Sequence, residues 1–437
     1  MSRNFDEFLT KVTSKVKSKV AHGMIKKELT NHLKELSHAY QKGETTKEEA
    51  DQKAIQEMGN PYTIGENLNH LHKARMDWSL LALFITIAGI SFLPLVGGIP
   101  HLSMPGPYFI GRQATWYTLA ILVILGFLFF DYRKLKKLCP VFYGVALTLL
   151  LYTHFFGLEF NGAQRWIVIG EFIADVTITL FLFFIAWAGI FTKINYYGTW
   201  KKQGLLLFLF WIPILIYLAL PNYMLSFIYF FTVVAMFVFS GVKKKLAIQI
   251  SLTNCVVGFI VFIPITYVVT STPHMYNRLL AFFNPEAYAQ TAGYINMLIR
   301  DVLLQAGWFG NGLLTGNPLP EGHTDFAFPY LVYSLGWVFG IFLCLLLLLF
   351  ILRISLNAFK TKDLFGRLLV IGGAALFTVP ICWNILMGLG LLPIMGVSLP
   401  FISYGGTMLL FYAAVLGLIL NVYRRKDIVE PTIETSS

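Results

Sequence analysis

Apolar and polar positions are segregated along the chain into one polar stretch followed by a long series of apolar runs. Residues 1–76 are rich in charge, whereas the rest of the chain alternates apolar runs with short polar connections. An apolar run of about 20 residues can cross a bilayer as an α-helix. We therefore predict an all-α polytopic membrane protein with about ten transmembrane helices. The predicted spans are 78–99, 114–130, 139–156, 171–192, 204–220, 224–241, 247–270, 327–352, 368–392 and 401–423.

Residues 1–76 predict a small soluble helical domain. One helix should stop at Gly43, and a second should begin at Thr46, whose hydroxyl is suited to an N-cap, and end before Gly59. Residues 25–72 resemble a short cytoplasmic prefix domain that precedes membrane proteins of Gram-positive bacteria, so both a regulatory docking role and a ligand-free bundle stay open. The apolar face of the first helix comprises Leu29, Leu33, Leu36 and Tyr40.

Composition supports the membrane assignment. Charged residues make up 13% of the chain, apolar residues 56%, and the mean hydropathy is +0.65, which excludes a water-soluble enzyme. The net charge of +11 does not indicate nucleic acid, because the basic residues stand singly or in short clusters between apolar runs. The cysteines lack metal-binding spacing and are interpreted as small apolar residues. They are Cys139, Cys255, Cys344 and Cys382.

Lysine and arginine set the expected orientation. With ten spans, all but four of the 34 Lys and Arg residues fall on the side of residues 1–76. Cytoplasmic loops carry such an excess of basic residues, so we expect a multi-pass protein of the cytoplasmic membrane with both termini, including the tail 427–437, in the cytoplasm. The membrane domain then covers residues 77–426. The basic residues on the opposite side are Arg112, Arg165, Arg278 and Arg300.

One extracytoplasmic loop, residues 271–326, is far longer than the few residues that most connections need, which favours a functional role. Residues 294–305 alternate apolar and polar side chains at helical spacing and predict a helix in the plane of the interface. The following Gly307-Trp-Phe-Gly-Asn-Gly312 is expected to form a flexible turn.

The candidate chemistry lies at the end of this loop. Asp325 stands where the loop joins span eight, and an apolar setting would raise its pKa toward the range of a general base. The alternative is that Thr324 or Asp325 merely caps the helix, with Pro329 tolerated in its first turn. Glu321 and His323 could likewise be site residues or solvated loop residues.

Two other outer stretches carry polar and aromatic side chains. Arg165 has a guanidinium suited to a phosphate, but beside Trp166 it could equally be an interfacial anchor. Ser403 and Tyr404 precede Gly405-Gly406, which either lets the backbone approach a ligand closely or forms a simple turn.

Together these motifs resemble the SEDS family, which comprises RodA, FtsW and SpoVE. Four motifs in order carry the resemblance over about residues 78–426, and span count, orientation and the place of the long loop agree with it. The motifs are Asn161 to Trp166, Asn284-Pro285 with Ala292-Gly293-Tyr294, Leu319-Pro-Glu-Gly-His-Thr-Asp-Phe326, and Gly390-Leu-Leu-Pro with Leu399-Pro-Phe-Ile-Ser-Tyr-Gly-Gly406.

The resemblance implies a peptidoglycan glycosyltransferase that polymerises lipid II on the outer face of the membrane with a class B penicillin-binding protein. It assigns the essential aspartate to Asp325. We interpret Asp325 as the general base and Arg165 as a pyrophosphate contact, with Trp166 and Tyr404 shaping the cavity. No metal ligands are assigned and no cofactor is certain, although a divalent cation could steady the leaving pyrophosphate. The expected substrate-binding residues are Arg165, Trp166, Glu321, His323, Thr324, Ser403 and Tyr404.

The chain also departs from the family pattern. A Gln-Pro-Ser-Glu stretch with a following lysine is expected after Trp166, but Glu171-Phe-Ile-Ala-Asp-Val-Thr177 stands there. Asn222 replaces an acidic residue, and Tyr333-Ser334 replaces paired glutamates. Two alternatives therefore stay open: a transporter (flippase) of lipid II, and a catalytically weak scaffold for a class B penicillin-binding protein.

Overall fold

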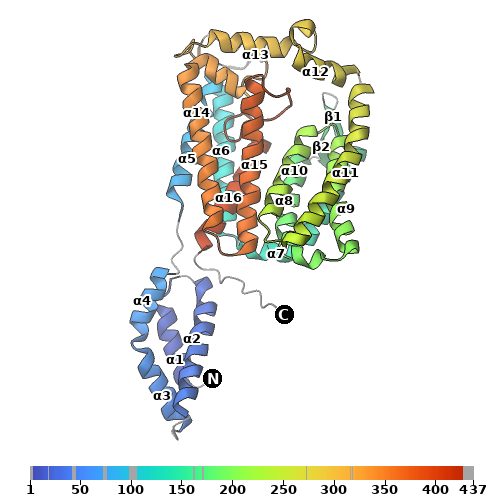
Figure 1. The fold of residues 1–437 in the computed structure, drawn as a ribbon. Helices are drawn as coiled ribbons and strands as arrows, with labels where there is room; N and C mark the ends of the chain where they lie inside the picture. The colour runs from blue at the N-terminus through green and yellow to red at the C-terminus, as the bar shows by residue number, and fades with distance from the viewer. Residues whose placement is uncertain are drawn as a thin grey trace. The chain divides into compact units, whose positions relative to one another are not determined.

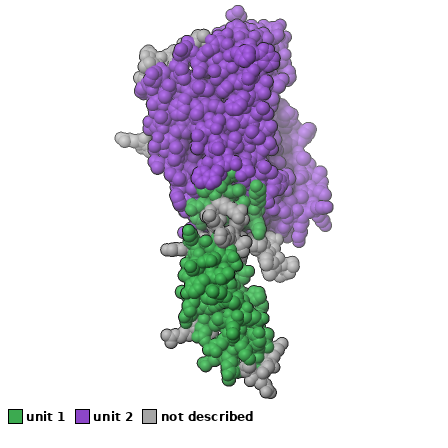
Figure 2. Space-filling view, turned by 90° about the vertical axis from the view of Figure 1, so that its left-hand side faces the viewer, with its two compact units in different colours: residues 1–77, 360–363, 422–437 green, residues 78–359, 364–421 purple. Residues whose placement is uncertain are grey.

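The computed structural model describes residues 3–17, 19–41, 46–71, 76–97, 106–160, 163–169, 172–271, 273–314, 316 and 318–426. The chain forms two compact units (Figure 2). The first comprises residues 1–77, 360–363 and 422–437, and the second residues 78–359 and 364–421. The predicted tail 427–437 lies outside the described residues.

Four helices make up most of the first unit: α1 (Arg3–Ser14), α2 (Lys19–Gln41), α3 (Lys47–Met58) and α4 (Pro61–Leu71). The predicted second helix is confirmed, because Thr46 and Glu49 form a reciprocal capping box before α3 and Gly59 ends it. Leu33 is fully buried, with Leu29 and Leu36 packed against the same core. The predicted stop at Gly43 lies outside the described residues.

The second unit is a helical bundle in which each of the ten predicted apolar runs coincides with a helix (Figure 1). Within the described residues, eight helices are long and apolar enough to cross a membrane, and α8 and α10 are shorter. The chain is therefore a multi-pass membrane protein. The helices are α5 (Trp78–Ile90), α6 (Gly106–Phe129), α7 (Leu135–Phe156), α8 (Thr177–Phe191), α9 (Trp200–Ala219), α10 (Tyr223–Val238), α11 (Lys244–Ser271), α14 (Ala327–Phe359), α15 (Leu364–Gly388) and α16 (Gly406–Arg425), with short 3-10 turns at Leu93–Leu95, Tyr132–Lys134 and Ile194–Tyr197.

Two spans begin later than predicted. Residues 172–175 form a strand, so α8 begins only at Thr177, and residues 401–405 are non-helical, so α16 begins at Gly406. Apolarity alone does not distinguish a short strand from a helix end, and β-branched residues favour pairing here. The strands β1 (Leu158–Phe160), β2 (Ala163–Ile169) and β3 (Phe172–Asp175) form an antiparallel sheet in the order β1-β2-β3.

The long loop is itself helical. It contains α12 (Pro273–Phe283), a 3-10 turn at Glu286–Tyr288 and α13 (Tyr294–Gln305), which confirms the predicted helix 294–305. Figure 1 shows α12 and α13 running across one end of the helical bundle. Ile299 and Val302 are the buried residues of α13, so the helix rests on this end through its apolar face.

The glycine-rich segment after α13 is not a free turn, which corrects the prediction. Its backbone pairs with a break in α14: Trp337 N donates to Gly307 O at 3.0 Å, and Gly312 N donates to Ser334 O at 2.9 Å. The break is at Gly336, which has φ 85° and ψ 170°. A side chain there would start 2.1 Å from Trp308 O, so only glycine fits.

The break makes α14 bend sharply. A Cβ on Gly340 would lie 2.7 Å from Cγ2 of Val332, although residues eight apart in a straight helix are separated by about 12 Å. The half before the break therefore packs against the half after it, and the loop that precedes α14 is carried back against the bundle.

Candidate active site

Asp325 is presented by a tight loop before α14. Glu321 adopts φ +56°, and its carbonyl accepts hydrogen bonds from Thr324 N and Phe326 N, both at 3.0 Å. The Thr324 hydroxyl donates to the carbonyl and to the carboxylate of Glu321. Thr324 therefore holds the loop, which argues against the alternative in which it is only a helix cap.

A buried asparagine of α15 fixes the loop from the other side. Asn384 is 0% exposed, and its Nδ2 donates to Asp325 O at 2.8 Å and to Val397 O at 2.7 Å. A Cβ on Gly396 would lie 3.5 Å from Oδ2 of Asp325, so the segment between α15 and α16 passes beside the carboxylate. Sequence analysis missed Asn384, although a lone amide inside an apolar run was the available signal.

The predicted residues of the last motif bind the same loop. Ser403 Oγ donates to Thr324 O at 2.6 Å and accepts from Leu399 N at 2.7 Å. Tyr404 N donates to His323 O at 2.8 Å, and the two rings lie 6.0 Å apart. Two motifs that are about 80 residues apart in the chain are therefore joined by one backbone hydrogen bond and one side-chain hydrogen bond.

Arg165 lies in β2 and forms an ion pair with Asp175 at the end of β3. Its Nε donates to Asp175 Oδ2 at 2.7 Å, and Asp175 is 2% exposed. Trp166 follows Arg165 in the strand, so its side chain points to the opposite face of the sheet, and its predicted role in shaping the cavity stays a prediction.

The sheet is anchored to the helices by side chains. Tyr152 of α7 donates its hydroxyl to Val168 O at 2.7 Å, and Asn222, between α9 and α10, donates Nδ2 to Gln164 O at 3.1 Å. Asn222, which departs from the family pattern, thus holds the strand that carries Arg165. Tyr333 and Ser334, also departures, use their carbonyls to bind the segment after α13.

Burial and nearby charges shift the pKa values of Asp325 and His323. The pKa of Asp325 is raised to about 6, with burial as the largest cause; the nearby Arg165 opposes the rise and Glu321 adds to it. Burial also lowers the pKa of His323, although Glu321 opposes this, so the imidazole tends to be neutral. A carboxyl group with a pKa near 6 is ionised at neutral pH and still basic enough to take a proton.

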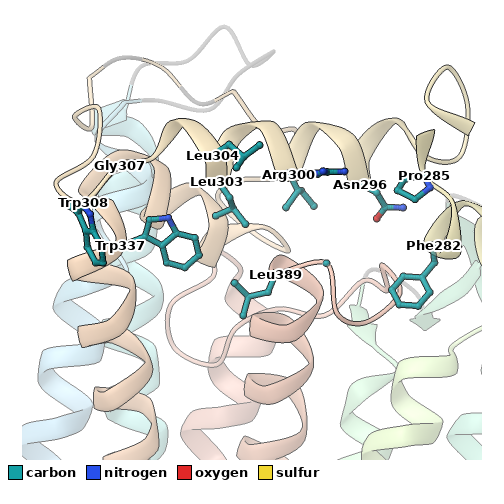
Figure 3. Close-up of a pocket in the computed structure, with 12 residues that line it drawn as sticks. Phe282, Pro285, Asn296, Arg300, Leu303, Leu304, Gly307, Trp308, Trp337 and Leu389 are labelled. Carbon is teal, nitrogen blue, oxygen red and sulfur yellow. The ribbon is translucent and has the colours of Figure 1, made fainter. Parts of the chain in front are cut away.

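A cavity of ≈ 600 Å³ lies beneath α13, next to the outer turns of α14 and α15 (Figure 3). Trp337 and Leu389 face this cavity, and Trp337 directly follows the break in α14. Gly388, next to Leu389, packs on Pro329, which lies four residues after Asp325. None of the predicted site residues lines it. The lining residues are Phe282, Pro285, Asn296, Ile299, Arg300, Leu303, Leu304, Gly307, Trp308, Trp337, Leu389 and Gly390.

The donor set does not fit a metal held by the protein. Among the described residues, no three His, Cys, Asp or Glu side chains are grouped closely enough to hold an ion. In the loop that carries Asp325, His323 Nε2 and Glu321 Oε2 are separated by 4.0 Å. No step is therefore assigned to a resident cation.

A family model for FtsW, RodA and SpoVE, described as "Cell cycle protein", matches residues 74–428. The chain belongs to this family. All the predicted site residues fall inside the match. Peptidoglycan glycosyltransferase MrdB of Escherichia coli K12 is 28% identical over 312 residues, which is 69% of this chain and 82% of that protein. Peptidoglycan glycosyltransferase RodA of Treponema pallidum is 24% identical over 390 residues, covering 72% and 89%.

Solved structures share the fold. A chain of a peptidoglycan synthase complex that coordinates polymerization and crosslinking aligns with a TM-score of 0.67 at 24% identity, covering 80% of this chain and 98% of that one. Rod shape determining protein RodA of Thermus thermophilus aligns with a TM-score of 0.57 at 23% identity, covering 80% and 97%. The overall fold of this chain is thus shared with these solved structures.

Proposed function

We propose that this protein is a peptidoglycan glycosyltransferase that polymerises lipid II at the outer face of the cytoplasmic membrane. The observation that carries the proposal is Asp325, a part-buried carboxylate with a raised pKa, held by Asn384 within the electrostatic range of Arg165. Family membership and relatives named as peptidoglycan glycosyltransferases support it.

In the proposed reaction Asp325 takes the proton from a sugar hydroxyl of the acceptor. The freed oxygen bonds to the anomeric carbon of the donor while the bond from that carbon to the lipid pyrophosphate breaks, so a single displacement inverts the anomeric centre. Arg165 contacts the departing pyrophosphate, whose negative charge grows during the step. Substrate contacts are assigned to Trp166, Glu321, His323, Thr324, Ser403 and Tyr404.

The proposed membrane orientation follows from the distribution of charge, and the proposed partner follows from the structural neighbours. Both termini are placed in the cytoplasm, because the basic residues gather on the side of residues 1–76. A class B penicillin-binding protein is the proposed partner, supported by the likeness to a chain of a complex that couples polymerization to crosslinking.

The test is polymerisation of purified lipid II by the full chain, alone and with a candidate class B penicillin-binding protein. Glycan strands in either reaction support the proposal. Movement of lipid II across vesicle membranes without strands would instead identify a transporter. If neither glycan strands nor movement of lipid II is observed and the partner still binds, the protein is a scaffold. The absence of the family lysine and paired glutamates favours that alternative.

The rate should depend on pH through Asp325. Only the ionised carboxylate can accept a proton, so activity should fall as pH drops through about 6, the pKa of Asp325, with the slope of a single proton. Initial rates between pH 5 and 8 at saturating lipid II measure this limb. A rate that stays flat down to pH 5 would contradict the role of Asp325 as base.

A further inference from the structure

Arg165 is exposed at one end and anchored at the other. Its side chain is 41% exposed, whereas its partner Asp175 is 2% exposed, and Asp175 Oδ2 accepts the hydrogen bond from Nε. The strands add a backbone bond at the same place, from Val176 N to Arg165 O at 3.0 Å. The Nε end of the guanidinium is therefore fixed, and its outer edge is turned toward solvent.

The anchor is itself held in one orientation. Asp175 Oδ1 accepts hydrogen bonds from the backbone N of Thr177, at 2.8 Å, and from the Thr177 hydroxyl. Thr177 begins α8, so the carboxylate is tied to a helix start with one oxygen and to Arg165 with the other. A buried carboxylate whose two oxygens are both bonded has little freedom to turn, and it fixes the direction of the group it binds.

We propose that Asp175 is a positioning residue that aims the Arg165 guanidinium at the pyrophosphate of the lipid-linked substrate. This rests on the proposed function. Asp175 lies in the stretch Glu171–Thr177, where the family pattern of Gln-Pro-Ser-Glu with a following lysine is missing. With that lysine absent, binding of the diphosphate depends more heavily on one well-placed arginine, and a buried carboxylate behind it supplies the placement.

The pair also sets the charge that Asp325 experiences. Asp325 is faced by Arg165 from β2 and by Glu321 from its own loop, and His323 lies 4.0 Å from Glu321. Asp175 offsets part of the positive charge of Arg165. Removing the Asp175 charge while keeping its shape should therefore leave a stronger cation beside Asp325 and make that carboxyl easier to ionise.

Two substitutions test the proposal with purified lipid II. Asp175→Ala removes the anchor, so KM for lipid II should rise about 10-fold or more, the effect of losing a charge-assisted hydrogen bond, with a smaller change in kcat. Asp175→Asn keeps the size of the side chain and one of its two acceptor oxygens, so it should bind lipid II better than Asp175→Ala. Because it has lost the negative charge, it should also shift the acid limb of the rate to lower pH. A purely structural role would not move that limb in this direction.

Asp131→Asn is the matched control, because Asp131 pairs with Arg133 at 2.8 Å in the turn before α7. Its KM and pH profile should equal those of the wild type. Wild-type KM in Asp175→Ala together with an unmoved acid limb in Asp175→Asn would overturn the inference. If Asp175→Ala does not fold, the pH limb of Asp175→Asn decides alone. A wild-type protein that makes no strands would instead reject the proposed function.

Discussion

Asp325→Asn should reduce glycan strand formation at least about 100-fold, which is the usual contribution of a general base. The amide keeps the size of the side chain but does not take up the acceptor proton. Asn384 donates its hydrogen bond to the backbone carbonyl of Asp325, not to the side chain. This contact should therefore persist in the variant. Strand formation from purified lipid II at neutral pH measures the effect.

Asp301→Asn is the control for this experiment. Asp301 is an exposed carboxylate of α13 in the same loop, and its replacement should leave the rate unchanged. The thermal unfolding temperature of Asp325→Asn should stay at or above that of the wild type, because a carboxyl group with a raised pKa is costly to bury in its ionised form. Equal strand yield from Asp325→Asn and the wild type would remove Asp325 from the mechanism.

Gly336→Ala should destabilise the protein by about 2 kcal/mol or more and lower strand formation as well. The positive φ of Gly336 disfavours any side chain, and the added Cβ would meet the Trp308 carbonyl at 2.1 Å. Relief of that contact requires the segment after α13 to separate from α14. Because the loop carrying Asp325 leads directly into the first half of α14, its position should change too.

The measurement is thermal unfolding in detergent, followed by strand formation below the unfolding temperature. Gly111→Ala is the matched control, since Gly111 lies in α6 and a Cβ there would meet nothing within 4 Å. Alanine favours a helix over glycine, so this variant should be as stable as the wild type or slightly more so. Equal stability of Gly336→Ala and Gly111→Ala would contradict the proposed importance of the break.

Local patterns were sufficient for much of the architecture. The ten apolar runs, the interface helix at 294–305 and the N-cap at Thr46 depend on neighbouring residues along the chain, and each coincides with a helix in the structure. The motif residues Thr324, Ser403 and Tyr404 were selected from sequence alone, and the structure joins them around one loop. Their substrate contacts stay predictions.

The features that were missed depend on contacts between distant segments. The strand at 172–175 forms because it pairs with β2. The apolar run around Gly336 predicts one continuous helix, and the break there becomes evident only from the contact with the Trp308 backbone. The residues next to Asn384 and Asp175 in the sequence do not predict that these side chains bind Asp325 and Arg165, respectively.

The amino-acid sequence by itself determined that this is a helical membrane protein of the FtsW, RodA and SpoVE family, since helix formation and membrane insertion depend on short stretches of apolar residues. Only the tertiary structure decided which groups surround Asp325. The Asn384 amide and the Arg165 charge come from separate elements, and the burial that raises the pKa of Asp325 to about 6 arises when those elements pack.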